Sequence, residues 1–292
     1  MDTRPGPSSA TAALLTEAAA LEARSPADAG ARYAAILDLD PACLAAHNAL
    51  ERLCAPQRYS AWMNVNCTID PRDDIFAFFA RHPMAKNPIR EYLSDGWRTL
   101  AELMLVMDAV GKPLPRVESM LEFAAGFGRF TRHLARVLPG RVACADVLPG
   151  TTDFLHGQFG VRTFASSHVP EDIRAPARYE LVFVLSLFTH LPVAIWPRWI
   201  RALQSMLSED GVLVFTTHSE RTAKREGVQF AADGTFFVAS SESPSIDADL
   251  YGTTFTTRAF SERVVQEATG VAPVAYFENA FWAGQDALVV RA

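Results

Sequence analysis

The strongest constraint on the fold is an alternation of short apolar runs and amphipathic segments that begins near residue 117. The apolar runs predict strands and the segments between or after them predict helices. Strands are expected at 117–123, 142–146, 161–165, 181–186 and 212–217, with helices near 128–138, 150–158, 193–207 and 258–268. This alternation predicts a mostly parallel sheet covered by helices on both faces. A closing pair of strands, 272–278 and 286–291, is joined by too few residues for a crossover helix, so these two should pair antiparallel.

The beginning of the chain, residues 1–56, is expected to form a helical extension. It is rich in alanine and poor in β-branched residues, and prolines divide it into three predicted helices, near 9–24, 27–39 and 42–54. Its small, aromatic, proline and leucine positions resemble those of a tetratricopeptide repeat: Ala29, Tyr33, Pro41 and Leu50. Because stacked repeats need about three units, we expect this extension to pack on the main domain or on a second copy of the chain. A groove for a protein partner is the alternative.

A lead-in connects this extension to the strands. Its apolar positions predict helices over 71–81 and 88–110. The longer helix is amphipathic, and its apolar side is expected in the core: Leu100, Leu103, Met104, Met107 and Val110. The chain therefore divides into the helical extension (1–56), a lead-in that covers a ligand pocket (57–116) and a sheet domain (117–292).

The composition is that of an ordinary globular protein, with 49% hydrophobic and 21% charged residues. The 27 Lys and Arg against 33 Asp and Glu give a net charge of −6 without a basic cluster, which disfavours nucleic acid and anionic membranes as partners. The four cysteines form no Cys-x-x-Cys pair, which indicates reduced thiols and a cytoplasmic protein. No apolar run approaches the roughly 20 residues that span a bilayer, and no signal peptide is recognisable.

The most informative motif runs from Met120 to Thr131, where a buried strand leads into a turn of small residues and then into a helix. Gly126 and Gly128 let the backbone approach a ligand, and the helix that begins near Arg129 presents N–H groups to negative charge. Such a loop suits a nucleotide-like cofactor. A dinucleotide fingerprint would place a third glycine at position 129, so a nicotinamide-dependent oxidoreductase is disfavoured. The phosphate-binding Gly-x-x-x-x-Gly-Lys-Ser/Thr motif is absent as well.

The remaining pattern, acidic-x-small-x-Gly-x-Gly, resembles that of the class I S-adenosylmethionine-dependent methyltransferases, and the likeness extends over about 120–291. Asp146 ends the second strand, 20 residues after Gly126, where that superfamily places the acid that binds the ribose hydroxyls. The segments 181–191 and 207–218 are similar to those that follow in the family. The resemblance implies an α/β fold with a seven-stranded, mostly parallel Rossmann-like sheet, an antiparallel last strand and helices on both faces. It also implies S-adenosyl-L-methionine as cofactor and S-adenosyl-L-homocysteine as product.

By the same resemblance, the cofactor site comprises residues that follow the first, second and fourth strands and one residue of the lead-in: Glu122, Phe123, Ala124, Gly126, Gly128, Arg129, Asp146, Val147, Ser186 and Tyr92. Tyr92 and Arg129 are candidates for binding the methionine carboxylate, with packing and helix capping as the alternatives. Ala124 departs from the family pattern, which usually has its first glycine there. If this backbone needs a positive φ, alanine costs about 1 kcal/mol; if a small side chain suffices, it costs almost nothing. The neighbouring Ala125 favours the second alternative.

Methyl transfer to a hydroxyl needs a base close to the reacting oxygen. His190 and His218 follow the fourth and fifth strands, at the carboxyl ends where open α/β sheets bind ligands, and imidazole accepts protons near neutral pH. Each could instead be a structural histidine. The superfamily's Asn/Asp-Pro-Pro-Tyr/Phe motif for planar amide or exocyclic amine nitrogens is missing after the fourth strand, which disfavours such acceptors. No Cys or His pair has the spacing of metal ligands.

The acceptor is expected to contact parts outside the common sheet. Residues 219–256 have no long periodicity and should form a lid over the strand ends. Candidate acceptor contacts are Tyr251, Trp282, Gln285 and Asp286. The sequence thus predicts O-methylation of a small polar acceptor, such as a sugar or another metabolite. The alternative is a non-catalytic interaction protein with a degenerate sheet domain and a partner-binding helical extension.

Overall fold

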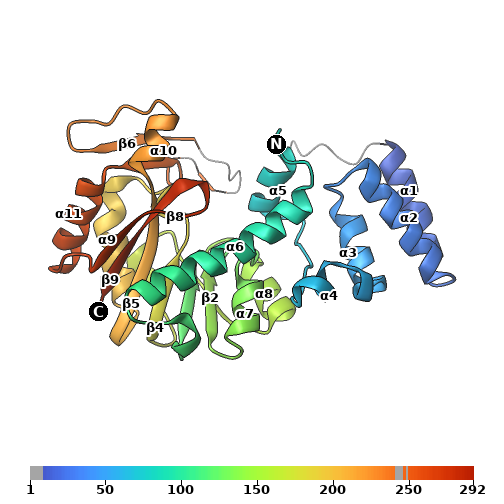
Figure 1. Cartoon of the computed structure of the whole chain (residues 1–292), viewed down its shortest axis with the longest axis horizontal. Coiled ribbons are helices and arrows are strands. Elements are labelled where there is room, and N and C mark those ends of the chain that lie inside the picture. The colour runs from blue at the N-terminus through green and yellow to red at the C-terminus, as the bar shows by residue number, and fades with distance from the viewer. Residues whose placement is uncertain (1–8, 241–245, 248) are drawn as a thin grey trace. The chain divides into compact units, whose positions relative to one another are not determined.

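The computed structural model describes residues 9–240, 246–247 and 249–292 (Figure 1). Within the predicted lid, positions 241–245 and 248 therefore lie outside the described residues. The chain divides into two compact units, with the boundary between Ser94 and Asp95.

The N-terminal unit is helical, as the sequence predicts. Its elements are α1 (Ser9–Leu21), α2 (Pro26–Leu39), α3 (Leu44–Leu53), α4 (Tyr59–Met63), α5 (Asp74–Arg81) and the first part of α6 (Pro88–Ala109). Pro26 occupies the first turn of α2, where the missing N–H is not needed. Ala29, Tyr33 and Leu50 are buried together between α1, α2 and α3. The likeness of these helices to a tetratricopeptide repeat remains a prediction.

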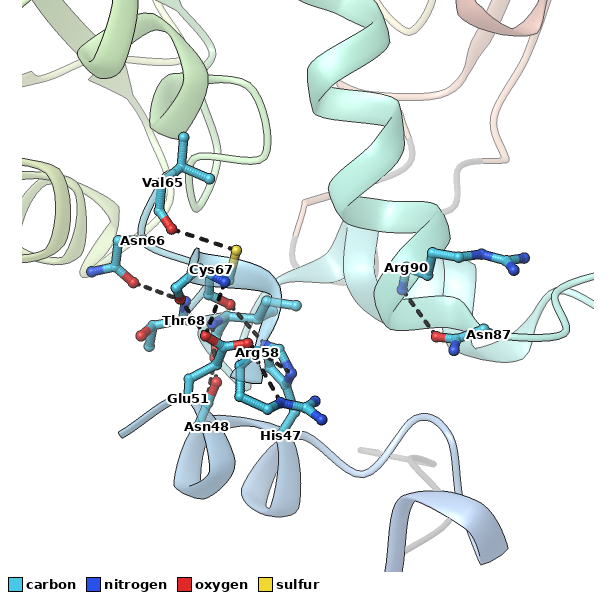
Figure 2. Close-up of polar contacts among 12 residues, drawn as sticks. His47, Asn48, Glu51, Arg58, Val65, Asn66, Cys67, Thr68, Asn87 and Arg90 are labelled. Atoms are coloured by element: carbon cyan, nitrogen blue, oxygen red, sulfur yellow. Dashed lines mark hydrogen bonds and ion pairs between the residues drawn. The ribbon is translucent and has the colours of Figure 1, made fainter. Parts of the chain in front are cut away.

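A buried polar cluster ties α3 to the chain around residue 67 (Figure 2). His47 Nε2 lies 2.8 Å from the carbonyl oxygen of Cys67, and His47 Nδ1 lies 4.0 Å from Glu51 Oε1. Asn48 donates to the carbonyl oxygen of Ile69 at 2.9 Å and accepts from its N–H at 3.2 Å. These contacts satisfy backbone groups of a segment without regular structure, so the cluster holds this part of the unit together.

The C-terminal unit is built on one sheet, which has nine strands in the described part of the chain. The order is β3-β2-β1-β4-β5-β7-β6, and β9 pairs with both β5 and β8. The strands are β1 (Met120–Phe123), β2 (Val142–Asp146), β3 (Arg162–Ala165), β4 (Tyr179–Val184), β5 (Leu207–His218), β6 (Thr235–Val238), β7 (Thr253–Thr256), β8 (Ala275–Phe281) and β9 (Gln285–Arg291). The first five strands are mutually parallel, and β9 is antiparallel to β5, as predicted.

Helices cover both faces of this sheet (Figure 1). One core lies under α9 (Trp196–Gln204) and α11 (Arg258–Thr269), and the other lies under α7 (Thr131–Val137), α8 (Thr151–Phe159) and the part of α6 after Ser94. Successive side chains of a strand point to opposite faces, so Val182 enters the first core and Leu181 and Phe183 enter the second. Burial on both faces explains why β4 is almost continuously apolar.

The structure has two more strands than predicted. They are β6 and β7, which form an antiparallel hairpin and, together with α10 (Glu220–Arg225), lie in the segment expected to be a lid. β5 is longer than predicted, because its first residues pair with β4 across a register shift near Tyr179. The prediction of a helix as far as residue 207 is therefore wrong, since α9 ends at Gln204.

The buried apolar side of α6 is displaced around the helix relative to the prediction. Leu100, Leu103 and Met107 are buried at i, i+3 and i+7, whereas Met104 is 38% exposed and Val110 is partly buried. Val106, which was not predicted, is buried at 3% exposure. The prediction of Met104 as a core residue is wrong, because the side of the helix that faces the core is turned toward Val106 and away from Met104.

Candidate functional site

The loop after β1 contains three residues with left-handed backbone: Ala124, Gly126 and Gly128, with φ of 59°, 56° and 79°. A Cβ added to Gly126 would have no protein atom within 4 Å, so the protein leaves space above this backbone. A Cβ on Gly128 would instead lie 2.5 Å from the ring of Phe159 and 2.8 Å from Leu155. Gly126 therefore borders open space on one side of the loop, and Gly128 allows α8 to pack closely against it.

The positive φ of Ala124 corrects a sequence expectation. The neighbouring alanine favours a position that merely requires a small side chain, yet Ala124 adopts the left-handed conformation that glycine tolerates best. An alanine in the sequence does not indicate the sign of φ, so the sequence could not distinguish a position that needs a positive φ from one that needs only a small side chain. The loop keeps the glycine conformation and bears a strain of about 1–2 kcal/mol.

Asp146, at the end of β2, is buried and connects two loops. Its Oδ2 accepts a hydrogen bond from the N–H of Gly126 at 2.7 Å, and its Oδ1 accepts one from the N–H of Leu148 at 2.8 Å. The carboxylate thus fixes the loop after β1 against the loop after β2. Val147, which follows it, is half-buried. This arrangement places an acceptor-rich side chain next to the open space at Gly126.

Glu122 lies below the loop. Its Oε2 accepts a hydrogen bond from the hydroxyl of Thr131 at 2.6 Å, and the thiol of Cys144 lies 3.8 Å away. Burial raises the pKa of Glu122 to about 8. The side chain of the adjacent Phe123 is also internal and packs edge-on against Trp199. Both residues shape the loop from inside, and their side chains face the protein interior.

Arg129 forms an ion pair with the buried Asp95 of α6 and lies over the ring of Trp282 at 5.8 Å. Gly96, next to Asp95, has no room for a Cβ because the carbonyl oxygen of Arg129 is too close. The ion pair therefore joins α6 to the loop after β1, a role that neither sequence alternative for Arg129 included. Asp95 belongs to no recognisable sequence motif, because its role is the ion pair with Arg129, which lies 34 residues later in the chain.

Tyr92 belongs to the N-terminal unit and is fully buried there. Its hydroxyl donates to Asp73 Oδ2 at 2.5 Å, and its ring packs edge-on against Phe76 and Phe79. These contacts are those of a core residue with a satisfied hydroxyl. Binding of the methionine carboxylate by Tyr92 stays a prediction.

The two candidate histidines lie close together, with ring centroids 6.3 Å apart. His190 Nδ1 lies 2.8 Å from the carbonyl oxygen of Gly252, and His218 Nδ1 lies 2.8 Å from that of Thr254. A carbonyl can only accept, so each Nδ1 carries a hydrogen and each Nε2 carries the lone pair in the neutral ring. The sequence could not reveal that the partners are the carbonyl oxygens of Gly252, just before β7, and of Thr254, within β7.

The surroundings of the two rings differ. His190 is 5% exposed, stacks on Tyr251 at 4.3 Å and belongs to a segment whose carbonyl oxygen accepts from the N–H of Gly252. His218 is half-buried and stacks on Phe255 at 4.5 Å. His190 thus anchors the residue before β7 to the segment that follows β4, whereas His218 is the more accessible of the two.

A second network joins the ends of β4, β5 and β9. The N–H of Ser186 donates to Thr216 Oγ1 at 2.8 Å, the Thr216 hydroxyl donates to Gln285 Oε1 at 2.6 Å, and Gln285 Nε2 donates to Ser186 Oγ at 2.7 Å. Ser186 has a φ of 62°, so it is, like Ala124, a residue other than glycine with left-handed backbone at the carboxyl edge of the sheet. Thr216 was not among the residues singled out in the sequence.

Two predicted acceptor contacts have other partners in the structure. Asp286 accepts from the hydroxyl of Tyr276 at 2.5 Å and from the N–H of Asn279 at 2.7 Å, and burial raises its pKa. These bonds hold an irregular part of β8, where Asn279 has a φ of 48°. Trp282 lies in the turn that follows β8 and contacts Arg129.

Within the described ranges, no helix combines the length and hydrophobicity that a membrane span requires. The same ranges contain no cluster of three or more His, Cys, Asp or Glu side chains suited to a metal ion.

Comparison with known proteins indicates the family to which this chain belongs. The model of a methyltransferase domain matches residues 90–241, more than half of the 292 residues. A search of curated proteins found no match. Among solved structures, the methyltransferase CcbJ from Streptomyces caelestis is 17% identical, with a TM-score of 0.51 over 75% of this chain and 96% of that chain.

Two further structures are similar to this chain. The 1,6-didemethyltoxoflavin-N1-methyltransferase from Burkholderia thailandensis is 16% identical, with a TM-score of 0.49 over 69% of this chain and 81% of its own. CalS10, an amino pentose methyltransferase from Micromonospora echinaspora, is 17% identical, with a TM-score of 0.48 over 70% and 96%. The matched residues include the loop after β1, Asp146 and both histidines. The chain therefore belongs to the methyltransferase domain family and is a class I S-adenosylmethionine-dependent methyltransferase.

Proposed function

We propose that this enzyme methylates a hydroxyl group of a small polar molecule, such as a sugar or another metabolite, and that His218 is the general base. The observation that carries the proposal is the position of His218: it ends β5, is half-buried, and its Nδ1 is bonded to a β7 carbonyl oxygen. Its Nε2 lone pair is thus set to receive a proton.

The residues around the loop after β1 fit S-adenosylmethionine. The space above Gly126 admits a ligand close to the backbone, and the carboxylate of Asp146 beside it offers acceptors suited to a ribose diol. Val147 and Ser186 border the same edge of the sheet. When bound, the cofactor supplies a methyl group that its sulfonium already activates.

With such a donor, the protein must orient the acceptor, exclude water and remove a proton. We assign proton removal to His218 and a positioning role to His190. The carbonyl oxygen of Thr254 holds the imidazole of His218 in one tautomer and one orientation, and Phe255 packs against its face. His190 ties the segment after β4 to Gly252 through its side chain and its backbone, and the carbonyl oxygen of the preceding Thr189 accepts from the N–H of Thr254, so these contacts keep Thr254 in place.

The aromatic candidates for contact with the acceptor are Tyr251 and Trp282. Tyr251 is half-buried and stacks on the imidazole of His190, so it gives the region a flat aromatic surface, whereas Phe255 is buried against the face of His218. A sugar presents apolar C–H faces and polar hydroxyl edges, which suits this combination. Trp282 is half-buried in the turn before β9 and is proposed as a more distant contact.

The test is a methyl-transfer assay with S-adenosylmethionine and a panel of monosaccharides, polyols and phenols, read by mass spectrometry of the methylated product. We expect O-methylation that falls at least a hundredfold in His218→Asn, since proton removal by a positioned base contributes about 10²–10⁴-fold. His190→Asn keeps a side chain of similar polarity, and we expect it to lower thermal stability along with activity. Full activity of His218→Asn, or methylation of nitrogen atoms alone, would contradict the proposal.

A further inference from the structure

We propose that Thr216 and Gln285 are positioning residues that aim the hydroxyl of Ser186 at S-adenosylmethionine, so that this hydroxyl donates a hydrogen bond to the bound cofactor. The inference rests on the methyl-donor site described above and deepens it. It assigns to Gln285 a role different from the acceptor contact that the sequence suggests.

The direction of each hydrogen bond follows from the burial of Thr216, which is completely inaccessible to solvent. Its Oγ1 accepts from the N–H of Ser186, and its own hydrogen goes to Gln285 Oε1. If the amide of Gln285 were turned over, Oγ1 of Thr216 would receive two donors and its hydrogen would lose this acceptor, which costs about 1–3 kcal/mol in a buried site. The amide therefore has its oxygen toward Thr216 and its nitrogen toward Ser186.

This orientation sets the polarity of Ser186. Its Oγ accepts from Gln285 Nε2 at 2.7 Å, so its own hydrogen points away from Gln285. Gln285 is 3% exposed, whereas Ser186 is half-buried and borders the carboxyl edge of the sheet. The hydroxyl is thus a donor whose hydrogen faces the open side of the network.

The backbone places this donor beside the cofactor loop. β1 and β4 are parallel neighbours, with Phe123 opposite Val184. One residue beyond Phe123 and two residues beyond Val184, the chain has left-handed backbone at Ala124 and at Ser186. Strained residues persist where a surrounding structure holds them and cluster at ligand sites. Here the N–H of Ser186 donates to Thr216, and the carbonyl oxygen of Ser186 accepts from the hydroxyl of Thr189, so both contacts hold the strained turn.

The strand register provides a matched control. Thr216 and Thr217 are consecutive on β5, so their side chains point to opposite faces of the sheet. Among the described residues, the Oγ1 of Thr217 is buried and has no hydrogen-bond partner. The same change, threonine to valine, therefore removes the network at 216 and leaves it intact at 217.

The experiment is calorimetric titration of the full chain with S-adenosylhomocysteine, with melting temperatures as a check of folding. We expect Ser186→Ala and Thr216→Val to weaken binding about tenfold, the size of one hydrogen bond. Thr216→Ser, which keeps the hydroxyl, should restore affinity, and Thr217→Val should bind like the wild type. Equal affinity of Ser186→Ala, Thr216→Val and the wild type would overturn the inference.

Gln285→Glu separates positioning from a merely structural role. The new carboxylate keeps the shape and the bond from Thr216, but it accepts from Ser186 and so turns the Ser186 hydrogen inward. We expect affinity for S-adenosylhomocysteine, relative to the wild type at the same pH, to fall about tenfold between pH 5 and pH 9 as the new carboxyl group loses its proton. A constant ratio across this range would contradict positioning. If the wild type failed to bind the ligand at all, the methyl-donor site itself would be wrong.

Discussion

Replacement of Ala124 by glycine tests the strain in the loop after β1. Ala124 has a φ of 59°, where a Cβ costs about 1–2 kcal/mol. Glycine removes this cost, but it also gives the unfolded chain more freedom, which lowers stability by about 0.4–1 kcal/mol. Ala124→Gly should therefore raise the free energy of unfolding by about 0.5–1 kcal/mol.

Ala125→Gly is the matched control. Ala125 is the next residue, is buried and has an ordinary negative φ. Both variants lose one methyl group and both loosen the unfolded chain, so the difference between them isolates the strain, about 1–2 kcal/mol.

Thermal unfolding followed by circular dichroism measures this difference. For a domain of this size, 1 kcal/mol corresponds to about 2–4 °C, so the two melting temperatures should differ by about 2–8 °C, with Ala124→Gly the higher. Affinity for S-adenosylhomocysteine should stay within a few fold, because the strained loop is already present without the cofactor. If Ala124→Gly lost as much stability as Ala125→Gly, the left-handed conformation of Ala124 would be refuted.

Three other changes test the site from different sides. Burial raises the pKa of Glu122 from its ordinary 4.5 to about 8, so between these values the folded state holds a proton that the unfolded state releases, and stability falls as pH rises through that window, by at most about 1.4 kcal/mol per pH unit. Glu122→Gln should flatten this slope in urea unfolding at pH 5.5 and 7.5, and an unchanged slope would exclude Glu122 as its source. Gly128→Ala places a Cβ against Phe159 and should therefore lower the melting temperature more than Gly126→Ala does. Gly126→Ala should instead weaken binding of S-adenosylhomocysteine more than Gly128→Ala does. The opposite result in both measurements would contradict the roles assigned to the two glycines. Asp146→Ala should make the binding free energy of S-adenosylhomocysteine, measured by calorimetry, less favourable by about 1.5–3 kcal/mol. Unchanged affinity would show that the ribose is bound elsewhere.

The sheet was predictable because its strands carry their own signals. β4 is apolar at consecutive positions and β2 is buried throughout, and such runs between helical patterns leave few alternatives to a doubly covered parallel sheet. The antiparallel pairing of β8 and β9 followed from the short connection between them. β7 carried a readable signal too, the β-branched run Thr253-Thr-Phe-Thr, but its polar surroundings favoured a loop.

The sequence predicted which loops form the candidate site, but it did not predict the contacts between side chains that are far apart in the chain. Gly126 and Asp146 occupy family positions, and the structure joins them by a hydrogen bond. The pairing of Arg129 with Asp95 and the network of Thr216 depend on which segments meet in space, and no local pattern encodes such meetings. The conformation of Ala124 was missed for another reason: alanine is compatible with both values of φ, and the choice between them is made by the surrounding structure.

The partners of the two histidines are main-chain atoms, and this has a consequence for how the enzyme can diversify. Gly252 immediately precedes β7 and Thr254 is its second residue, so their carbonyl oxygens point to the same side of this extended segment. Side chains along the hairpin can therefore vary without changing either imidazole tautomer, as long as the register is kept. Loss or gain of a single residue within 252–254 would present the opposite edge of the strand and release both rings at once. Tolerance to substitution and intolerance to one-residue length changes are thus built into the same strand.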